Sequence, residues 1–259
     1  MSLRGQGLEQ AIRAVGGVSE LARRIGVSQP SVSNWVRIPA ERVIAVEAAT
    51  GVPRTVLRPD LYQEASVAEL DEVDAARAQE YAVLAALLMR APDATLLARL
   101  ARIVVDASPL GLAHAALAQA AGEADADQVS REYFALFIGL GRGELLPYGS
   151  YYLTGFLHER PLARLREDLA RFGVARAEGV YEPEDHIGIL CETMAGLITG
   201  QFPAPEDAQR VLFEKHIAPW AGRFFADLEN AQAAQFYRHV GRVGRTFLDI
   251  ESEAFALPS

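Results

Sequence analysis

Apolar residues recur at helical spacing through almost the whole sequence, and this pattern constrains the fold more than any other feature. Alanine and leucine are abundant, and proline and glycine fall between the periodic runs. Alternation of apolar and polar residues, which would indicate strands, is scarce. The sequence therefore predicts an all-α protein. The expected helices cover residues 7–15, 19–25, 29–36, 40–50, 67–90, 94–107, 110–121, 127–139, 150–157, 161–172, 184–200, 205–217, 219–229 and 232–253.

A junction containing two prolines divides the predicted helices into two groups. Residues 51–66, GVPRTVLRPDLYQEAS, end in small polar residues, which is typical of a linker. We expect a small helix-turn-helix domain over residues 1–62 and a larger all-helical domain over residues 67–259. Within the larger domain, glycines and a proline predict an irregular stretch at 139–150.

The two parts differ in charge. Residues 1–62 carry eight arginines and five acidic residues, a net charge of +3, whereas the remainder carries 17 basic and 29 acidic residues, a net charge of −12. A basic N-terminal part favours contact with nucleic acid, and the alternative is ordinary scatter of surface charge. The single cysteine, Cys191, favours a reducing compartment. Without an apolar signal region or an uncharged apolar run of about 18 residues, we expect a cytoplasmic protein with no membrane span.

The segment GGVSELARRIGVSQPSVSNWV, residues 16–36, predicts two short helices around a tight turn at Gly26. Ser19 and Ser28 precede apolar runs and are expected to cap these helices. This is the arrangement of a helix-turn-helix, whose second helix enters the DNA major groove. The residues expected to face the core are Leu21, Ala22, Ile25, Val32 and either Trp35 or Val36.

The second of these helices carries side chains suited to DNA. Small or amide-bearing groups at its outward positions can hydrogen-bond to base edges, and nearby arginines can contact phosphates. The candidate DNA-binding residues are Ser28, Gln29, Ser31, Ser33, Asn34 and Arg37, with Arg23, Arg24 and Arg54 as further phosphate contacts.

Residues 7–62 resemble the Cro-like repressor domains, including the LRPDLY ending at 57–62. The resemblance implies operator DNA as a partner and a homodimer as the binding form. The segment after Trp35, VRIP, has fewer cations than relatives carry, and few cations release few counterions. We therefore expect weak affinity unless two copies bind together. The alternative is a helix-turn-helix that serves as an interaction module.

A cluster of carboxylates, a proline and a histidine, EPEDHI at residues 182–187, precedes the apolar run GILCETMAGLI. Pro183 suits the first turn of a helix, and acidic residues favour the positive end of the helix dipole. We expect a helix at 184–200 with one apolar face. That face is predicted to consist of Ile187, Leu190, Cys191, Met194, Leu197 and Ile198.

Opposite this apolar face, Asp185 and Glu192 are expected to share a polar face, because residues seven apart lie within about 20° of each other on a helix. Gly188 and Gly196 on the same side leave room for close approach by another helix of the same fold or by a peptide partner. An acidic face would favour a basic peptide.

Other chemistries fit EPEDHI poorly. A zinc helix of the HExxH type needs a ligand four residues after His186, where the sequence has Leu190. Asp185 and Glu192 would lie about two turns, roughly 10 Å, apart, which is too far to share a proton. Neither a GxxxxGK[ST] motif nor a GxSxG motif is present. We expect no catalytic residue, no metal and no cofactor.

Residues 75–256 resemble the TorD family of molybdoenzyme maturation chaperones. The resemblance rests on a YxSxY run (Tyr148, Ser150, Tyr152), an EPxDH run (Glu182, Pro183, Asp185, His186) and an HxxPW…FF run (His216, Pro219, Trp220, Phe224, Phe225). It implies an all-α cytoplasmic chaperone, not an enzyme. Its partners would be the apo form of a molybdenum-cofactor oxidoreductase and that client's twin-arginine signal peptide. The style of PYGSYYLTGFLHERPL indicates a formate dehydrogenase as the client.

The resemblance also implies a peptide-binding region around Asp185 and His186. Two alternatives stay open for the aromatic runs, because Tyr148 and Tyr152 can simply pack with satisfied hydroxyls and the run at 216–225 has core spacing. His186 can equally be a structural hydrogen-bonding residue. The candidate client-peptide residues are Tyr148, Ser150, Tyr152, Glu182, Asp185, His186 and Glu192.

Two functions therefore compete. The first is a maturation chaperone with a DNA-binding N-terminal domain. The second is a Cro-like transcriptional regulator whose helical C-terminal domain senses a ligand or partner. Three specific runs in the larger domain, and few cations in the DNA-reading helix, favour the chaperone.

Overall fold

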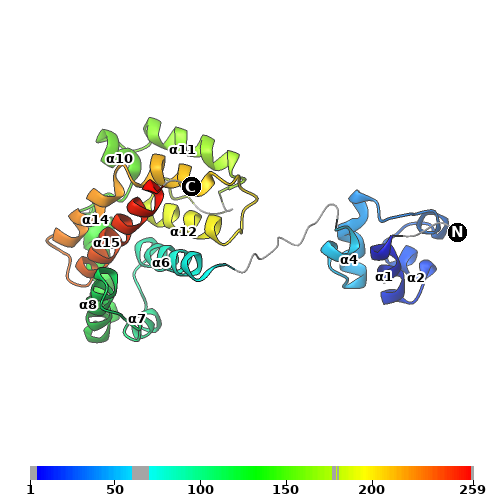
Figure 1. Cartoon of the computed structure of the whole chain (residues 1–259), viewed down its shortest axis with the longest axis horizontal. Helices are drawn as coiled ribbons and strands as arrows, with labels where there is room; N and C mark the ends of the chain where they lie inside the picture. The colour runs from blue at the N-terminus through cyan, green and yellow to red at the C-terminus, as the bar shows by residue number, and fades with distance from the viewer. Residues whose placement is uncertain (1–4, 60–69, 177–178, 180, 258–259) are drawn as a thin grey trace. The chain divides into compact units, whose positions relative to one another are not determined.

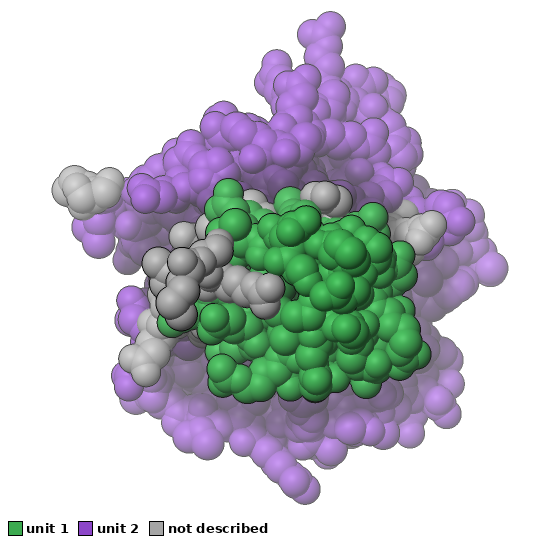
Figure 2. All heavy atoms as spheres, turned by 90° about the vertical axis from the view of Figure 1, so that its right-hand side faces the viewer, with its two compact units in different colours: residues 1–69 green, residues 70–259 purple. Residues whose placement is uncertain are grey.

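The computed structural model of the chain describes residues 5–59, 70–176, 179 and 181–257. It divides into two compact units, Met1–Glu69 and Leu70–Ser259, which Figure 2 colours separately. Helices form all the regular structure of the described residues, apart from one isolated bridge, so the all-α prediction is confirmed. The expected boundary between residues 62 and 67 lies outside the described residues.

The smaller unit is built from short helices around a core that includes Leu8, Leu21 and Val32, all buried. α2 and α3 contact each other across a turn at Gly26, whose φ of +68° suits glycine. The elements are α1 (Gln6–Val15), α2 (Val18–Arg24), α3 (Gln29–Ser33), the 3₁₀ turn η1 (Ala40–Arg42), α4 (Val43–Thr50) and α5 (Arg54–Leu57).

Both predicted serine caps of the smaller unit are wrong. α2 begins at Val18, so Ser19 lies inside the helix and caps nothing. Ser28 does occupy the N-cap position of α3, but its hydroxyl hydrogen-bonds to the Ser31 hydroxyl at 2.7 Å instead of to a backbone N–H. α3 also ends at Ser33, three residues before the predicted end, and Val36 is exposed while Trp35 packs on the core.

The larger unit is organised around α12 (Ile187–Ile198), which packs along α6 (Glu72–Met89). All six residues of the predicted apolar face of α12 are buried. α15 (Tyr237–Ala256) packs on α14 (Ala221–Asn230) and on α8 (Pro109–Glu123), as Figure 1 shows. The remaining elements are α7 (Ala94–Leu100), α9 (Ala126–Tyr133), α10 (Gly149–Thr154), α11 (Arg160–Arg171), α13 (Ala208–Val211) and the π-helical turns η2 (Phe134–Ile138) and η3 (Leu212–Ile217).

Several predicted helices differ in extent from the observed ones. The predicted helices at 127–139 and 205–217 change to π-helical hydrogen bonding partway, in η2 and η3. Those predicted at 94–107, 150–157 and 232–253 are shorter or displaced. None of the helices in the described part of the chain has the length and apolar composition of a membrane span.

The start of α12 corrects an expectation that matters for the site. The helix begins at Ile187, and Nδ1 of His186 caps it by accepting the N–H of Gly188 at 3.0 Å. Pro183 and Asp185 precede the helix, so Pro183 is not in a first turn. Asp185 and Glu192 therefore share no helical face, because only Glu192 lies on α12.

Candidate functional site

The segment before α12 is held against the start of α10 by a short antiparallel bridge. The Gly149 N–H donates to the Asp185 carbonyl at 2.9 Å, and the Ile187 N–H donates to the Pro147 carbonyl at 2.9 Å. Tyr148 and His186 are the bridge partners. The YxSxY and EPxDH runs, far apart in the sequence, therefore lie side by side.

Asp185 is the most buried carboxylate of this junction, with 3% of its surface exposed. Its Oδ2 accepts the backbone N–H of Ser150 at 2.7 Å. Its Oδ1 and the Ser150 Oγ are both buried without a hydrogen-bond partner among the described residues. Because an unpaired buried polar atom costs free energy, a ligand that brings a hydrogen-bond donor to Asp185 would be stabilised.

Tyr148 and His186 form the packed part of the junction. Their rings meet edge to face with centroids 5.3 Å apart, and the Tyr148 hydroxyl donates to Glu182 Oε1 at 2.5 Å. Burial, reinforced by this hydrogen bond, raises the pKa of Tyr148. Burial lowers the pKa of His186 to about 4, so its ring is neutral near pH 7, in agreement with Nδ1 accepting a backbone N–H.

Tyr152, four residues after Tyr148, contacts the third run instead. Its hydroxyl donates to Asp227 Oδ2 at 2.9 Å, and its ring lies 5.4 Å from that of Trp220. Burial, followed by the bond to Asp227, raises the pKa of Tyr152. Trp220 and Phe224 are fully buried, so the packing interpretation of the 216–225 run is confirmed.

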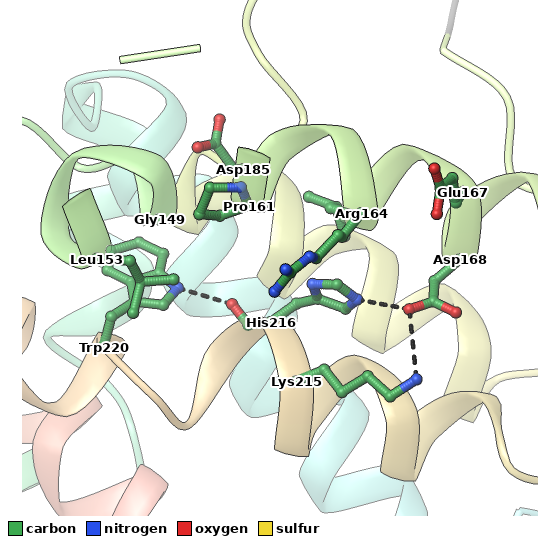
Figure 3. Close-up of a pocket in the computed structure, with 11 residues that line it drawn as sticks. Gly149, Leu153, Pro161, Arg164, Glu167, Asp168, Asp185, Lys215, His216 and Trp220 are labelled. Carbon is green, nitrogen blue, oxygen red and sulfur yellow. Dashed lines mark hydrogen bonds and ion pairs between the residues drawn. The ribbon is translucent and has the colours of Figure 1, made fainter. Parts of the chain in front are cut away.

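A cavity of about 430 Å³ lies beside Asp185, between α10, α11 and η3 (Figure 3). Trp220 and Leu153 give it an apolar wall, and Arg164 lines it without an ion pair or hydrogen bond to any described residue. Its charged and polar lining consists of Arg164, Glu167, Asp168, Asp185, Lys215 and His216. The cavity is therefore polar on several sides, with one apolar wall.

Hydrogen bonds fix the floor of this first cavity, as Figure 3 shows. His216 Nε2 lies 2.8 Å from Asp168 Oδ2, and the Trp220 indole N–H donates to the His216 carbonyl at 2.7 Å. Lys215 is 3.8 Å from the same Asp168 oxygen. Burial lowers the pKa of His216 in spite of Asp168, so a neutral ring donates to the carboxylate. No three His, Cys, Asp or Glu side chains of the described residues are placed to hold a metal ion.

A second cavity, of about 510 Å³, is lined from the opposite face of α11 and contains three glutamates. Arg166 and Arg176 both pair with Glu184, at 2.9 Å and 2.8 Å. Burial by itself would raise the pKa of Glu184. Hydrogen bonds from Arg176 and Arg166 outweigh this effect and lower the pKa to about 2. Glu182 and Glu192 line the same cavity without a cationic partner among the described residues.

The structure thus separates the seven predicted client-peptide residues. Asp185 and Ser150 lie at the first cavity or against it, and Glu182 and Glu192 lie at the second. Tyr148 and His186 form the junction between the two motifs, and Tyr152 belongs to the aromatic core contact with Trp220.

The sequence did not single out Arg164 or Lys215, which line the first cavity. A charged side chain on an amphipathic helix is usually solvated, so nothing in the local pattern marks these two. Glu184 was within the EPEDHI cluster, but its pairing with Arg166 and Arg176 depends on the approach of α11.

The space beside each of the two glycines of α12 is occupied by a side chain of the larger unit. A Cβ at Gly188 would lie 2.8 Å from the Met89 sulphur, and one at Gly196 would lie 2.4 Å from Cε2 of Phe202. The sequence is compatible with either another part of the same fold or a peptide partner beside these glycines, and the structure shows other parts of the same chain there.

In the smaller unit, Gln29, Ser31, Asn34 and Arg37 are exposed, and Ser33 is half-buried. The Gln29 amide donates to the Ser33 hydroxyl at 2.8 Å. Gln29 and Ser31 lie on the surface of α3, and Asn34 and Arg37 follow its end; part of the hydrogen-bonding capacity of α3 is used within the helix.

Most arginines assigned to phosphate contacts are paired within the unit. Arg23 and Arg24 both contact Glu20, at 2.6 Å and 2.8 Å, and Arg54 contacts Glu47 at 2.7 Å. Hydrogen bonds from Arg23 and then Arg24 lower the pKa of Glu20 to about 2. These carboxylates compete with phosphates for the same cations.

The chain is therefore an all-α protein in which a helix-turn-helix unit precedes a larger helical unit with a polar cavity. Comparison with known families assigns each unit a relative. Residues 105–226 match the family described as "Nitrate reductase delta subunit", and residues 8–66 match "Bacterial toxin YdaS".

Curated relatives give the same division. The chaperone protein TorD of Aliivibrio fischeri is 28% identical over 146 residues, which is 52% of this chain and 68% of that protein. The Escherichia coli protein named "Putative transcriptional regulator YdaS" is 48% identical over 59 residues, 20% of this chain and 60% of that protein. A solved structure named as a redox enzyme maturation protein from Archaeoglobus fulgidus aligns with a TM-score of 0.46 and 22% identity, over 66% of this chain and 93% of that one. The family matches and the two curated relatives confirm the TorD and Cro-like resemblances of the sequence.

Proposed function

We propose that the larger unit is a maturation chaperone that binds the arginine-bearing signal peptide of an apo-oxidoreductase, with a molybdenum-cofactor enzyme such as a formate dehydrogenase as the client. The observation that carries this proposal is the buried Asp185 Oδ1, which has no hydrogen-bond partner among the described residues and belongs to a residue that lines a cavity of about 430 Å³. The similarity to TorD chaperones supports the same assignment.

An arginine side chain suits this site for two reasons. Its guanidinium group carries five N–H donors in a fixed plane, which suits a carboxylate oxygen without a donor such as Asp185 Oδ1. Its three-carbon stem can lie along the apolar wall formed by Trp220 and Leu153. The net charge of −12 outside residues 1–62 also attracts a basic peptide.

The proposal is tested with a synthetic leader peptide of about 20 residues, a usual leader length, in which two adjacent arginines precede an apolar alanine–leucine segment. We call it the arginine–apolar peptide. Asp185→Asn keeps an oxygen to accept the Ser150 N–H but removes the carboxylate. We expect the dissociation constant to rise roughly tenfold to a hundredfold, because a hydrogen bond to a charged group contributes about 1.5–3 kcal/mol.

Glu253→Gln is the matched control, because Glu253 is an exposed carboxylate of α15 that lines neither cavity. Equal binding by Asp185→Asn and the wild type would contradict the proposal. A second measurement uses the full chain as bait in its native lysate, where failure to recover a molybdoenzyme subunit would argue against the client class.

For the smaller unit we propose DNA binding through α3. Support comes from the exposed Gln29, Ser31 and Asn34 and from the similarity to YdaS. The test measures binding of the full chain to the DNA upstream of its own gene as the salt concentration rises. Phosphate contacts release counterions, so affinity should fall with salt, and a flat response or no binding would contradict the proposal.

A further inference from the structure

The second cavity continues into a longer groove between α6 and α12. A third cavity, of about 940 Å³, shares Met89, Glu192 and Gln201 with the second, so the two cavities adjoin at these residues. The stretch of α6 that lines it runs from Ala75 to Met89, which corresponds to about 21 Å of helix at 1.5 Å per residue. Its length therefore matches a helical partner of three to four turns.

One face of α6 explains why this groove is open. Five alanines of α6 line it at helical spacing, together with Gln79 and Met89, whereas other bulky residues of α6 are buried in the core. The alanines are Ala75, Ala78, Ala82, Ala85 and Ala86, and the buried residues are Tyr81, Leu84, Leu87 and Leu88. None of the α6 positions that line the groove before Arg90 is charged, although Ala75 and Ala82 are exposed. An exposed helix face normally carries charged side chains, so this uncharged alanine face is suited to being covered by an apolar helix.

The charges along the groove indicate what the covering helix carries. Arg166 and Arg176 are occupied by Glu184. Glu192, exposed where the two cavities join, has no ion pair or hydrogen bond among the described residues. Arg90 is a single cation at the end of α6. A basic residue of the partner would therefore find its counter-charge near Glu192.

We propose that this groove binds the apolar helical segment of the client's signal peptide, with a basic residue of that peptide near Glu192. The inference rests on the proposed function, which supplies the signal peptide. Export leaders combine a basic region with an apolar region of about 7–15 residues, which matches the length and polarity of the groove. A second copy of this chain is the poorer occupant, because its larger unit carries the same negative charge.

The test fills the groove with a larger side chain. Ala82→Phe places a ring on an exposed position of the groove, and Ala76→Phe makes the same change on an exposed position of α6 that does not line it. Three peptides serve as probes. They are the arginine–apolar peptide, an arginine–polar peptide with serine and glutamine in place of the apolar segment, and an apolar peptide with glutamine in place of the arginines.

We expect Ala82→Phe to weaken binding of the arginine–apolar peptide about tenfold or more, and Ala76→Phe to leave it unchanged. Binding of the arginine–polar peptide should not respond to Ala82→Phe, because it lacks the segment that fills the groove. Equal affinity of wild type and Ala82→Phe for the arginine–apolar peptide would overturn the inference. So would a demonstration by sedimentation that Ala82→Phe acts only by breaking a dimer.

The same probes separate failure of the inference from failure of the proposed function. If the arginine–polar peptide binds as tightly as the arginine–apolar peptide and depends on Asp185, the groove inference alone fails. If the apolar peptide binds, responds to Ala82→Phe and ignores Asp185→Asn, and the arginines add nothing, the Asp185 proposal and the contact near Glu192 fail, whereas binding of the apolar segment in the groove stands. If no peptide binds, both fail.

A second measurement locates the peptide directly. Cys191 is fully buried, and burial raises its pKa, so a cysteine introduced at an exposed position is labelled selectively. A fluorophore on Gln79→Cys, within the groove, should change its emission when the arginine–apolar peptide binds. The same label on Ala76→Cys should not respond, and equal responses at both positions would contradict the inference.

Discussion

One arginine cluster in each unit shows how differently ion pairs can be held, although local pairs such as Arg210–Glu214 occur in the larger unit as well. Arg23 and Arg24 of the smaller unit pair with Glu20, three and four residues away, at the protein surface. Arg77 of the larger unit pairs with Glu251, 174 residues further on, and Glu251 is 1% exposed. Local surface pairs can exchange one partner for another, such as a phosphate, whereas a long-range buried pair holds the fold together.

Helix caps show the same contrast. The side chains of Asp71, Asp93, Ser108 and Asp125 each accept a backbone N–H at the start of a helix in the larger unit. In the described residues of the smaller unit, no helix start has such a bond. Its short helices therefore depend on their small common core.

Removing the buried arginine should have the largest effect. Arg77→Ala leaves the buried Glu251 carboxylate without its cation, and breaking one side of such a pair costs about 3–5 kcal/mol. We expect denaturant unfolding of the larger unit to shift accordingly. Arg23→Ala, which breaks an exposed pair, should leave the unfolding of the smaller unit nearly unchanged. Similar shifts for both variants would show that the distinction between the units is wrong.

The buried histidine at the start of α12 should produce the next largest effect. Its folded pKa of about 4 lies below the unfolded value of 6.5, so the unfolded state binds more protons between these pH values. The free energy of unfolding should therefore fall as the pH drops from 6.5 toward 4, by up to about 3 kcal/mol at 1.36 kcal/mol per pKa unit.

His186→Asn isolates this contribution, because asparagine is a good N-cap residue and does not titrate. We expect its free energy of unfolding to depend less on pH than that of the wild type over this range. His158→Asn, which removes an exposed histidine, is the control. If both variants keep the pH dependence of the wild type, His186 is not the group responsible.

Removing a helix-capping side chain should have a smaller effect on stability, and the effect should differ between the two units. Asp125→Ala removes an oxygen that accepts the Gln128 N–H at 3.0 Å, and loss of such a cap costs about 1 kcal/mol. Ser28→Ala removes a hydroxyl that, among the described residues, bonds to the Ser31 hydroxyl and to no backbone N–H, so we expect less than about half of that cost. Thermal unfolding of the two variants would measure the difference, and an equal loss would mean that Ser28 caps α3 in solution.

The smallest effect concerns the surface pairs of the smaller unit. Glu20→Gln releases Arg23 and Arg24 from their carboxylate, so both become available to phosphates. If the unit binds DNA, the slope of log affinity against log salt should steepen by about 1 to 2, because each added phosphate contact contributes about 0.9. Glu9→Gln, which changes an exposed glutamate of α1, should not alter the slope.

The EPEDHI cluster shows how far the sequence alone could predict the site. Periodicity correctly predicted the buried face of α12, because spacing of apolar residues is a local property. The start of that helix was placed too early, since Pro183 and the acidic residues equally fit a first turn. Residues 182–186 stay outside the helix because they bridge to residues 147–149, and no local sequence pattern encodes that contact.

The sequence by itself determined the helical periods, the helix-turn-helix and the motifs that resemble TorD, because each of these is a relation between residues near one another in the chain. Only the tertiary structure decided that Asp185 is buried with an oxygen unpaired within the described part of the chain, and that Glu182 and Asp185 belong to separate cavities. It also decided that α6 and α12 leave an alanine-lined groove between them. Burial and cavities depend on which distant helices pack together, and that choice is made by the whole core at once.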